Sequence, residues 1–256
     1  MKAKFTFLVA LVFFIVGYSP DTFGIFNNTP SLKPFPVIGQ QKEPALVKIK
    51  ELDDSFIIDL KYATTDNFTG KKIYSQDICL IHRNTAQKLI SAHKEFKQLG
   101  YRIKIYDAYR PYSAQRILYD AAENKSFLAD PEKGSNHNRG AAVDITLVDE
   151  KGDELPMPSM FDEFSKKSRI DYYNTTRELI NNRELLGRVM IKHGFKRIGN
   201  EWWHFDDTKA KQYPLLDIPF EDFMDPRPSG LLSELQSITY PTYLCTRCRV
   251  GRFTFC

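Results

Sequence analysis

The sequence predicts an α+β fold, in which helices pack on a central, mostly antiparallel sheet. Segments typical of strands alternate with segments typical of helices between residues 56 and 205. None of the junctions carries the Gly-rich loop that binds phosphates in the parallel-sheet nucleotide folds. The sequence shows no internal repeat, and its 256 residues are enough for one or two domains with a substantial core.

Four segments have the pattern of strands. Residues 56–62 (FIIDLKY) are apolar and β-branched, and residues 101–109 (YRIKIYDAY) alternate between apolar and polar side chains. In residues 141–149 (AAVDITLVD) the odd positions through 147 are apolar, so Asp144 lies on the opposite face of the strand. Residues 201–205 (EWWHF) are short enough for a strand edge. These segments supply the predicted sheet.

Three segments have the pattern of helices. Residues 84–99 place apolar side chains near a period of 3.6, and Gly100 follows as a stop signal. Residues 112–123 follow a proline that restricts the preceding backbone and favours a helix start. Residues 172–193 form the third helical region, which Gly194 ends. We expect these helices to cover the sheet.

The composition is ordinary for a globular protein. Apolar residues make up 42% of the chain and charged residues 27%, with a formal net charge of +4. Lysine and arginine are mixed with aspartate and glutamate throughout, so the charge forms no basic tract of the kind that binds nucleic acid. We therefore expect no nucleic-acid partner. Nothing in the sequence indicates the oligomeric state.

The N-terminus resembles a secretory signal peptide. Lys2 and Lys4 precede an apolar run over residues 5–17. The run is short for a transmembrane helix, which needs about 20 residues. We expect residues 1–24 to be removed and the protein to be exported, to the periplasm or outside the cell, without stable membrane insertion. An uncleaved anchor is the alternative.

Cysteines are few, and three of the four lie near the C-terminus. The chain contains Cys79, Cys245, Cys248 and Cys256, which allow three disulfide pairings, and the sequence does not choose among them. The CTRC stretch lacks the second pair or the nearby histidine that a structural zinc site needs, so we expect none there.

The candidate metal ligands are His137, Asp144 and His204. An aspartate within a buried strand is costly unless it is paired or binds a metal. Histidine nitrogen and carboxylate oxygen are both good ligands for Zn²⁺, and hydrolytic zinc sites use three protein ligands and one open position. Surface or packing roles are expected for the other three histidines, which are His82, His93 and His193.

Two further residues complete the candidate chemistry. Glu201 could take a proton from a metal-activated water. In a regular strand Glu201 and His204 would point to opposite faces, so a turn or bulge must separate them, or Glu201 must precede the strand. Arg110 stands before a proline, where a fixed guanidinium could stabilise an oxyanion, although a surface role is the alternative.

Several motifs, in this order, resemble the zinc D-alanyl-D-alanine dipeptidases of the VanX type, over roughly residues 48–220. The motifs are DLKYATTDNFTG (59–70), DAYRP (107–111), SNHNRGAAVDITLV (135–148), MFD (160–162), NRELLGRVMIKHGF (182–195) and EWWHF (201–205). The resemblance implies a hedgehog/D,D-peptidase-like fold. It divides the chain into a signal peptide (1–24), an extended leader (25–47), the zinc dipeptidase domain (48–220) and a C-terminal extension of unknown role (221–256).

The resemblance also implies an activity and a set of site residues. It implies hydrolysis of the dipeptide D-Ala-D-Ala in cell-wall peptide metabolism, with one Zn²⁺ per chain. The implied zinc ligands are His137, Asp144 and His204. The implied catalytic residues are Glu201, as the base, and Arg110, which stabilises the transition state. The residues implied to line the dipeptide pocket are Ser135 and Asp162, and Asp162 is expected to hold the substrate ammonium group.

One departure from the family pattern affects the pocket. The stretch MPSMFD has Pro158 where the family has a flexible glycine, which could change the length of peptide accepted. A related D,D-carboxypeptidase or endopeptidase on the same fold, acting on peptidoglycan peptides, is an alternative. A non-catalytic zinc-containing binding module is a third reading.

Overall fold

The structure is a computed structural model that describes residues 45–224. The predicted signal peptide, most of the leader and most of the C-terminal extension lie outside the described residues, as do Cys245, Cys248 and Cys256. Cys79 is buried and forms no disulfide within the described part of the chain. No helix among residues 45–224 is long and apolar enough to cross a membrane.

A five-stranded sheet forms the centre of the molecule, in the order β2-β4-β5-β7-β6. Three of its four neighbour pairs are antiparallel and only β2 and β4 run parallel, so the predicted α+β fold with a mostly antiparallel sheet is confirmed. A separate pair of strands, β1 and β3, is also antiparallel. The strands are β1 (Leu46–Lys48), β2 (Ile57–Ile58), β3 (Leu80–His82), β4 (Arg102–Asp107), β5 (Ala142–Val148), β6 (Phe195–Arg197) and β7 (His204–Asp207).

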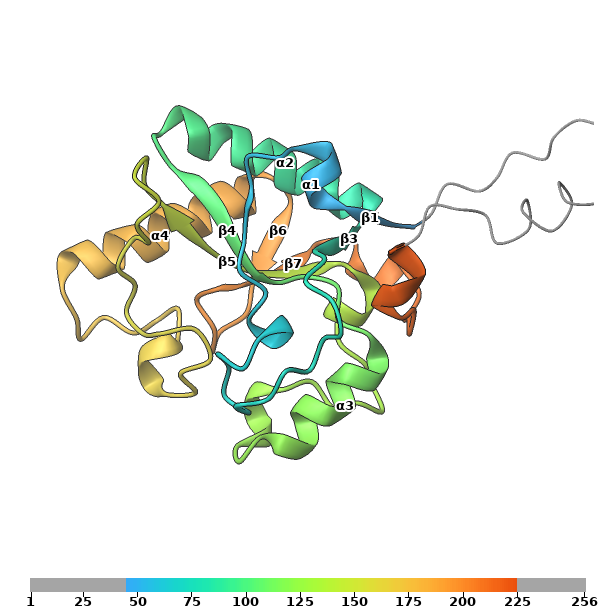
Figure 1. Ribbon diagram of the computed structural model, residues 1–256. Coiled ribbons are helices and arrows are strands. Elements are labelled where there is room, and N and C mark those ends of the chain that lie inside the picture. Colours follow the sequence, from blue (N-terminus) through green and yellow to red (C-terminus); the bar gives the residue numbers. More distant parts are fainter. Residues whose placement is uncertain (1–44, 225–256) are drawn as a thin grey trace, which may run out of the picture. The chain divides into compact units, whose positions relative to one another are not determined.

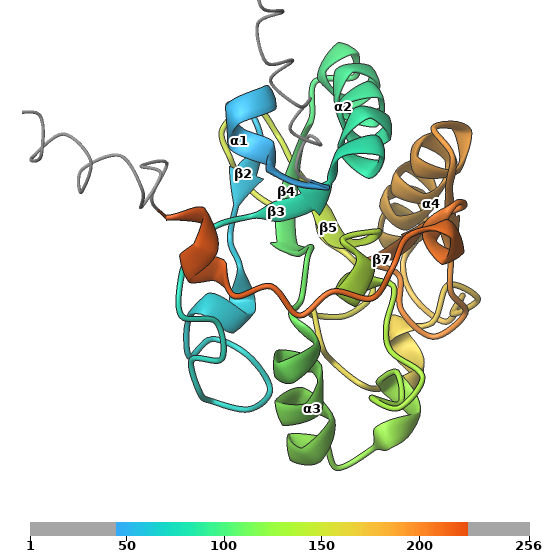
Figure 2. The same ribbon diagram turned by 90° about the vertical axis from the view of Figure 1, so that its right-hand side faces the viewer.

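Helices α2 (Arg83–Gln98) and α4 (Arg177–Lys192) lie together on one side of the sheet, and α3 (Tyr112–Ala121) lies apart from them with the long loops (Figures 1 and 2). A short helix, α1 (Ile49–Leu52), follows β1. The three longer helices agree with prediction, except that α4 begins later. Its cap is Thr176, whose hydroxyl accepts a hydrogen bond from Leu179 N at 3.4 Å.

The central strand β5 is buried along its whole length. Its apolar side chains Val143, Ile145 and Leu147 join the core that contains residues from α2 and α4. The opposite face of the same strand carries Asp144. Because β5 is covered on both faces, a charged side chain there cannot reach bulk water, so its charge needs partners inside the protein.

The prediction of a strand over residues 56–62 is wrong beyond Ile57 and Ile58. These two residues pair with β4 at the edge of the sheet, and the chain then leaves the sheet for a 3₁₀ turn over Lys61–Ala63. The Lys61 ammonium lies 3.1 Å from Asp59 and 2.7 Å from Asp66, which stabilises the turn. The turn directs Tyr62 inward, where its side chain is buried.

A tight bend between a 3₁₀ turn (His137–Arg139) and β5 sets the position of the candidate site. Gly140 has φ +61°, a left-handed conformation that costs little only for glycine. A Cβ atom there would lie 2.6 Å from a Leu46 methyl carbon and 2.7 Å from the backbone N of His82. The carbonyl of Gly140 accepts a hydrogen bond from that same N at 2.8 Å. The close approach joins the bend to β3.

Candidate metal centre and active site

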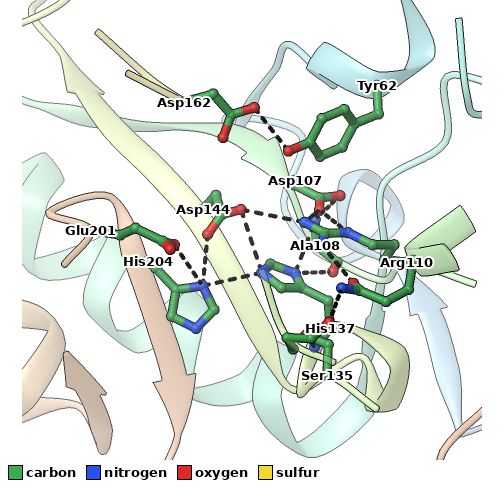
Figure 3. Close-up of polar contacts among 12 residues, drawn as sticks. Tyr62, Asp107, Ala108, Arg110, Ser135, His137, Asp144, Asp162, Glu201 and His204 are labelled. Carbon is green, nitrogen blue, oxygen red and sulfur yellow. Dashed lines mark hydrogen bonds and ion pairs between the residues drawn. The ribbon is translucent and has the colours of Figure 1, made fainter. Parts of the chain in front are cut away.

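The register of the sheet brings the first carboxylate and histidine together. Asp144 on β5 stands opposite His204 on β7 and, on the other side, opposite Asp107 on β4 (Figure 3). The ladder between β4 and β5 is irregular just before Asp107, as at a β-bulge. His137 comes from the 3₁₀ turn that precedes β5. The end of β4, the turn with β5, and the start of β7, which are distant in sequence, therefore meet at one point.

The three predicted ligands form one compact, buried group. His137 Nε2 lies 3.2 Å from His204 Nδ1, and Asp144 Oδ1 lies 2.9 Å from that Nδ1. Asp144 Oδ2 lies 3.4 Å from His137 Nε2. Ligands of a tetrahedral zinc ion with bonds of about 2.0–2.1 Å are separated by roughly 3.3 Å, so the group has the spacing that such an ion requires.

Each ring has an outer acceptor for the nitrogen that points away from the group. The other nitrogen of His137, Nδ1, donates to the carbonyl of Ala108 at 2.7 Å. The other nitrogen of His204, Nε2, donates to Asp206 Oδ1 at 3.0 Å. In neutral rings that donate these two bonds, His137 Nε2 and His204 Nδ1 each carry a lone pair, and the two nitrogens face each other and a carboxylate. This donor set fits a metal ion, since outer acceptors of this kind orient histidine ligands.

The charges around the group favour a cation. Burial lowers the pKa of His204, but hydrogen bonds and charges from Asp144 and Asp206 outweigh burial and raise it well above its usual value. Burial raises the pKa of Asp144, but His137 and His204 outweigh burial and bring it below its usual range. A positive charge shared by these side chains is thus stabilised, and a bound divalent ion would supply one.

Glu201 meets the geometric condition set by the sequence. A bend at Trp202 and Trp203 separates it from β7, which begins at His204, so Glu201 precedes the strand. Its Oε2 lies 4.0 Å from His204 Nδ1. Burial raises the pKa of Glu201 to about 7, and the positive charge of His204 opposes that rise. A carboxyl group that titrates near neutral pH can both accept and return a proton.

The two tryptophans hold this bend in place. Both are buried, and their rings meet edge to face at 5.4 Å. Trp202 is fixed at both ends, because its backbone N donates to Ser168 O at 2.8 Å and its indole N donates to Ser159 Oγ at 3.0 Å. The carbonyl of Trp203 accepts from Ile145 N on β5 at 3.0 Å. The segment between Glu201 and His204 is therefore rigid.

Arg110 is buried and fixed at the end of β4. Its Nε and Nη2 donate to Asp107 Oδ2 at 3.0 and 2.6 Å, and its Nη1 donates to Gln115 Oε1 at 2.8 Å. These bonds use three of the five N–H groups of a guanidinium. Nη2 also lies 3.9 Å from Asp144 Oδ2, which places Arg110 beside the ligand group. The remaining N–H groups can donate to an oxygen bound there.

Ser135 and Asn138 shape the turn that carries His137. Ser135 Oγ accepts from His137 N at 3.2 Å, and Asn138 Oδ1 accepts from Ser135 N at 2.7 Å. The Asn138 amide donates to the carbonyl of Arg110 at 2.8 Å, which ties the turn to the end of β4. Ser135 is thus both a wall of the cavity and part of the frame behind His137.

A cavity of about 230 Å³ opens over the ligand group, and Asp162 lies on its wall. Asp162 has φ +56°, a conformation that is uncommon outside glycine. Its Oδ2 accepts a hydrogen bond from Tyr62 at 2.9 Å, on the opposite side of the ligands from Ser135 (Figure 3). Burial and the charges of Asp144 and Glu201 raise the pKa of Asp162 well above its usual value, although the Tyr62 hydroxyl and Arg110 oppose the rise.

The other three histidines lie away from this group. His93 is buried, stacks on Phe56 and accepts a hydrogen bond from Ile103 N at 3.1 Å, and burial lowers its pKa to about 4. His82 caps α2, and His193 lies 2.8 Å from Glu95 beyond the end of α4. Their contacts agree with the packing and surface roles expected for them.

Sequence reasoning missed three residues that support the site. Asp206, two positions after His204 on the same face of β7, orients that ring, and this period of two was the available signal. Asp107 holds Arg110 and lies three residues before it in the DAYRP motif. Tyr62 was assigned to a strand, and no local pattern predicts its bond to Asp162, a residue 100 positions away.

A comparison with protein families assigns the chain. The family model described as D-Ala-D-Ala dipeptidase matches residues 42–226. The chain belongs to the D-Ala-D-Ala dipeptidase family. The predicted family, and with it the prediction of a peptidase, is confirmed.

Two relatives named as dipeptidases agree with membership of the family. The D-alanyl-D-alanine dipeptidase of Escherichia coli is 40% identical over 181 residues, which cover 71% of this chain and 94% of that protein. The enzyme of the same name from Enterococcus faecalis is 31% identical over 185 residues, which cover 64% of this chain and 88% of that protein. A solved structure of the vancomycin resistance D,D-pentapeptidase VanY matches at 16% identity and a TM-score of 0.34. The match covers 59% of this chain and 88% of that chain.

The hydrogen bond between His204 and Asp206 leads to a prediction about metal affinity. Replacing Asp206 with alanine removes the acceptor that fixes the His204 ring, so we expect zinc affinity to fall about 10- to 100-fold. Competition with a chromophoric chelator measures this. The matched control is Lys196→Met, which removes the ammonium 3.8 Å from Asp206 Oδ2 and leaves the His204 bond intact. Equal affinity for Asp206→Ala and wild type would contradict the assigned role.

Proposed function

We propose that the protein is a zinc-dependent dipeptidase that hydrolyses D-Ala-D-Ala to two molecules of D-alanine in cell-wall peptide metabolism. The main support is the buried group of two histidines and one aspartate, with Glu201 and Arg110 beside it. The cavity of about 230 Å³ is smaller than the about 300–1,000 Å³ typical of pockets for drug-sized ligands, which favours a small substrate.

The proposed proton transfers belong to Glu201. A zinc ion held by His137, Asp144 and His204 would polarise the peptide carbonyl and lower the pKa of the attacking water. Glu201 takes the proton of that water, because its carboxylate lies beside the ligand group. When the C–N bond breaks, Glu201 returns the proton to the leaving amine.

Arg110 supports the charge that develops during attack. The carbonyl oxygen becomes negative as the water adds, and a fixed donor stabilises that charge without reorganising. Its bonds to Asp107 and Gln115 orient the guanidinium before the substrate arrives. Burial lowers the pKa of Arg110, but the charge of Asp107 outweighs burial and raises it well above its usual value, so the group stays positive.

Asp162 accounts for the preference for a free dipeptide. Its carboxylate faces the cavity and accepts a hydrogen bond from Tyr62, and the nearby Asp144 and Glu201 make a positive ligand favourable there. We propose that it binds the substrate ammonium group, and that Ser135, across the ligand group, borders the carboxylate end. A peptide with no free amine at that position would leave the carboxyl group of Asp162 without a cation.

A substitution of the base separates chemistry from metal binding. We expect Glu201→Gln to reduce kcat by at least about 100-fold, because general-base catalysis contributes about 10²–10⁴-fold, while zinc content stays at one ion per chain. Stopped or coupled assays for D-alanine measure kcat, and atomic absorption measures the zinc content. Glu178→Gln, an exposed carboxylate on α4, is the control for loss of charge. Hydrolysis near the wild-type rate by Glu201→Gln would rule out this mechanism.

A substrate panel tests the proposed specificity. We expect D-Ala-D-Ala to be hydrolysed at least about 30 times more efficiently than N-acetyl-D-Ala-D-Ala, since leaving a buried charge unpaired costs about 2–5 kcal/mol. L-Ala-L-Ala and a muropeptide pentapeptide complete the panel. Faster hydrolysis of the pentapeptide would identify a D,D-carboxypeptidase, and a zinc-loaded protein that cleaves none of the panel would identify a binding module.

We also propose that the protein is exported, because Lys2 and Lys4 precede a short apolar run at the N-terminus. Fractionation of the native cells, followed by N-terminal sequencing, measures this. We expect the mature chain in the periplasm or medium without the first residues. A full-length chain confined to the cytoplasm would contradict the proposal.

A further inference from the structure

The cavity wall has an uneven distribution of charge. Four carboxylates border it, and its cationic side chains other than histidine are Arg110 and Lys211. The carboxylates are Asp144, Asp162, Glu201 and Asp206. A dipeptide carries one ammonium group and one carboxylate, so a site that binds both ends needs a cation for the carboxylate.

Arg110 is not available for that task. Three of its N–H groups bind Asp107 and Gln115, and the rest face Asp144 and the ligand group. Its position beside the ligands places it at the reacting carbonyl.

Lys211 is in the opposite situation. It belongs to a 3₁₀ turn (Ala210–Gln212) that follows β7, and its side chain is exposed at the cavity. Within residues 45–224 its ammonium group has no hydrogen bond and no carboxylate within 4.0 Å. By contrast Lys61, Lys88 and Lys104 each have a carboxylate partner. Lys211 is therefore a cation with no partner in the described chain.

The segment after Lys211 packs on the Ser135 side of the cavity. Leu216 N donates to Asn138 O at 2.8 Å, and Arg139 donates to the carbonyl of Tyr213. Leu215 fills the space beside Gly134, where a Cβ atom would lie 2.5 Å from its methyl carbon. These contacts join the segment to the turn that carries Ser135, across the ligand group from Asp162 (Figure 3).

We propose that Lys211 binds the terminal carboxylate of the dipeptide and so determines specificity for a free C-terminus. This inference rests on the proposed dipeptidase function and extends it to the other end of the substrate. Asp162 and Lys211 then bind opposite charges at opposite ends of one cavity, with the peptide bond between them at the ligand group. Lys211 is exposed, so its contribution is that of a partly screened charge pair.

The test compares D-Ala-D-Ala with D-Ala-D-Ala amide, which lacks the carboxylate. In Lys211→Met we expect the KM for D-Ala-D-Ala to rise about two- to fivefold with kcat nearly unchanged, and the KM for the amide to stay the same. Lys211→Arg is expected to retain most of the preference for the acid. The control is Lys209→Met, two residues earlier and outside the cavity wall. High salt is expected to weaken the wild-type preference and leave Lys211→Met unaffected.

A binding measurement keeps the inference independent of turnover. In the zinc-loaded Glu201→Gln protein, calorimetry gives the dissociation constants of D-Ala-D-Ala and its amide with and without Lys211→Met. A wild-type protein that fails to hydrolyse D-Ala-D-Ala refutes the proposed function, and the binding ratio still decides the role of Lys211. Equal loss of affinity for acid and amide, or no loss for either, overturns the inference.

Discussion

The buried carboxylate of Asp144 is the constraint on which the rest of the site depends. It stands on the central strand of the sheet, where water cannot solvate its charge, and its neighbours on either side are Asp107 and His204. Two adjacent carboxylates would be unstable together without cations. Arg110 neutralises Asp107. The two imidazoles, with the metal that they can hold, neutralise Asp144. The fold thus requires the same charges that the chemistry uses.

Features encoded over short distances were predictable from the sequence. The helix over residues 84–99 follows from its period and its terminal glycine, and the strand that carries Asp144 follows from strict alternation. Three of the proposed chemical side chains were recognisable because each departs from its local pattern. His204 and Glu201 flank an aromatic pair, and Asp144 interrupts an apolar strand. Such departures are expected at functional sites, where local preference gives way to chemistry.

Features that depend on contacts between distant segments were not predictable. Tyr62 looked like a strand residue, and only the bond to Asp162, formed after the chain has folded, explains its turn inward. The carbonyl of Ala108 fixes the tautomer of His137, but a backbone atom leaves no mark in the sequence. The strand over residues 56–62 was overestimated because its composition suits a sheet, while the edge position allows only two residues to pair. Sequence pattern reports propensity, and these outcomes depend on three-dimensional partners.

The segment from Glu201 to His204 shows how rigidity produces function. A plain strand would place the base and the ligand on opposite faces, so the backbone must bend between them, and a bend within a core is stable only if its polar groups are bonded. Trp202 and Trp203 satisfy this condition through the bonds to Ser168, Ser159 and Ile145. Their bulk also excludes water from the side of the ligand group that faces the core. The pair that looks like ordinary core therefore sets the distance between Glu201 and His204, the proposed proton acceptor and metal ligand, and a small displacement of either tryptophan would change both positions together.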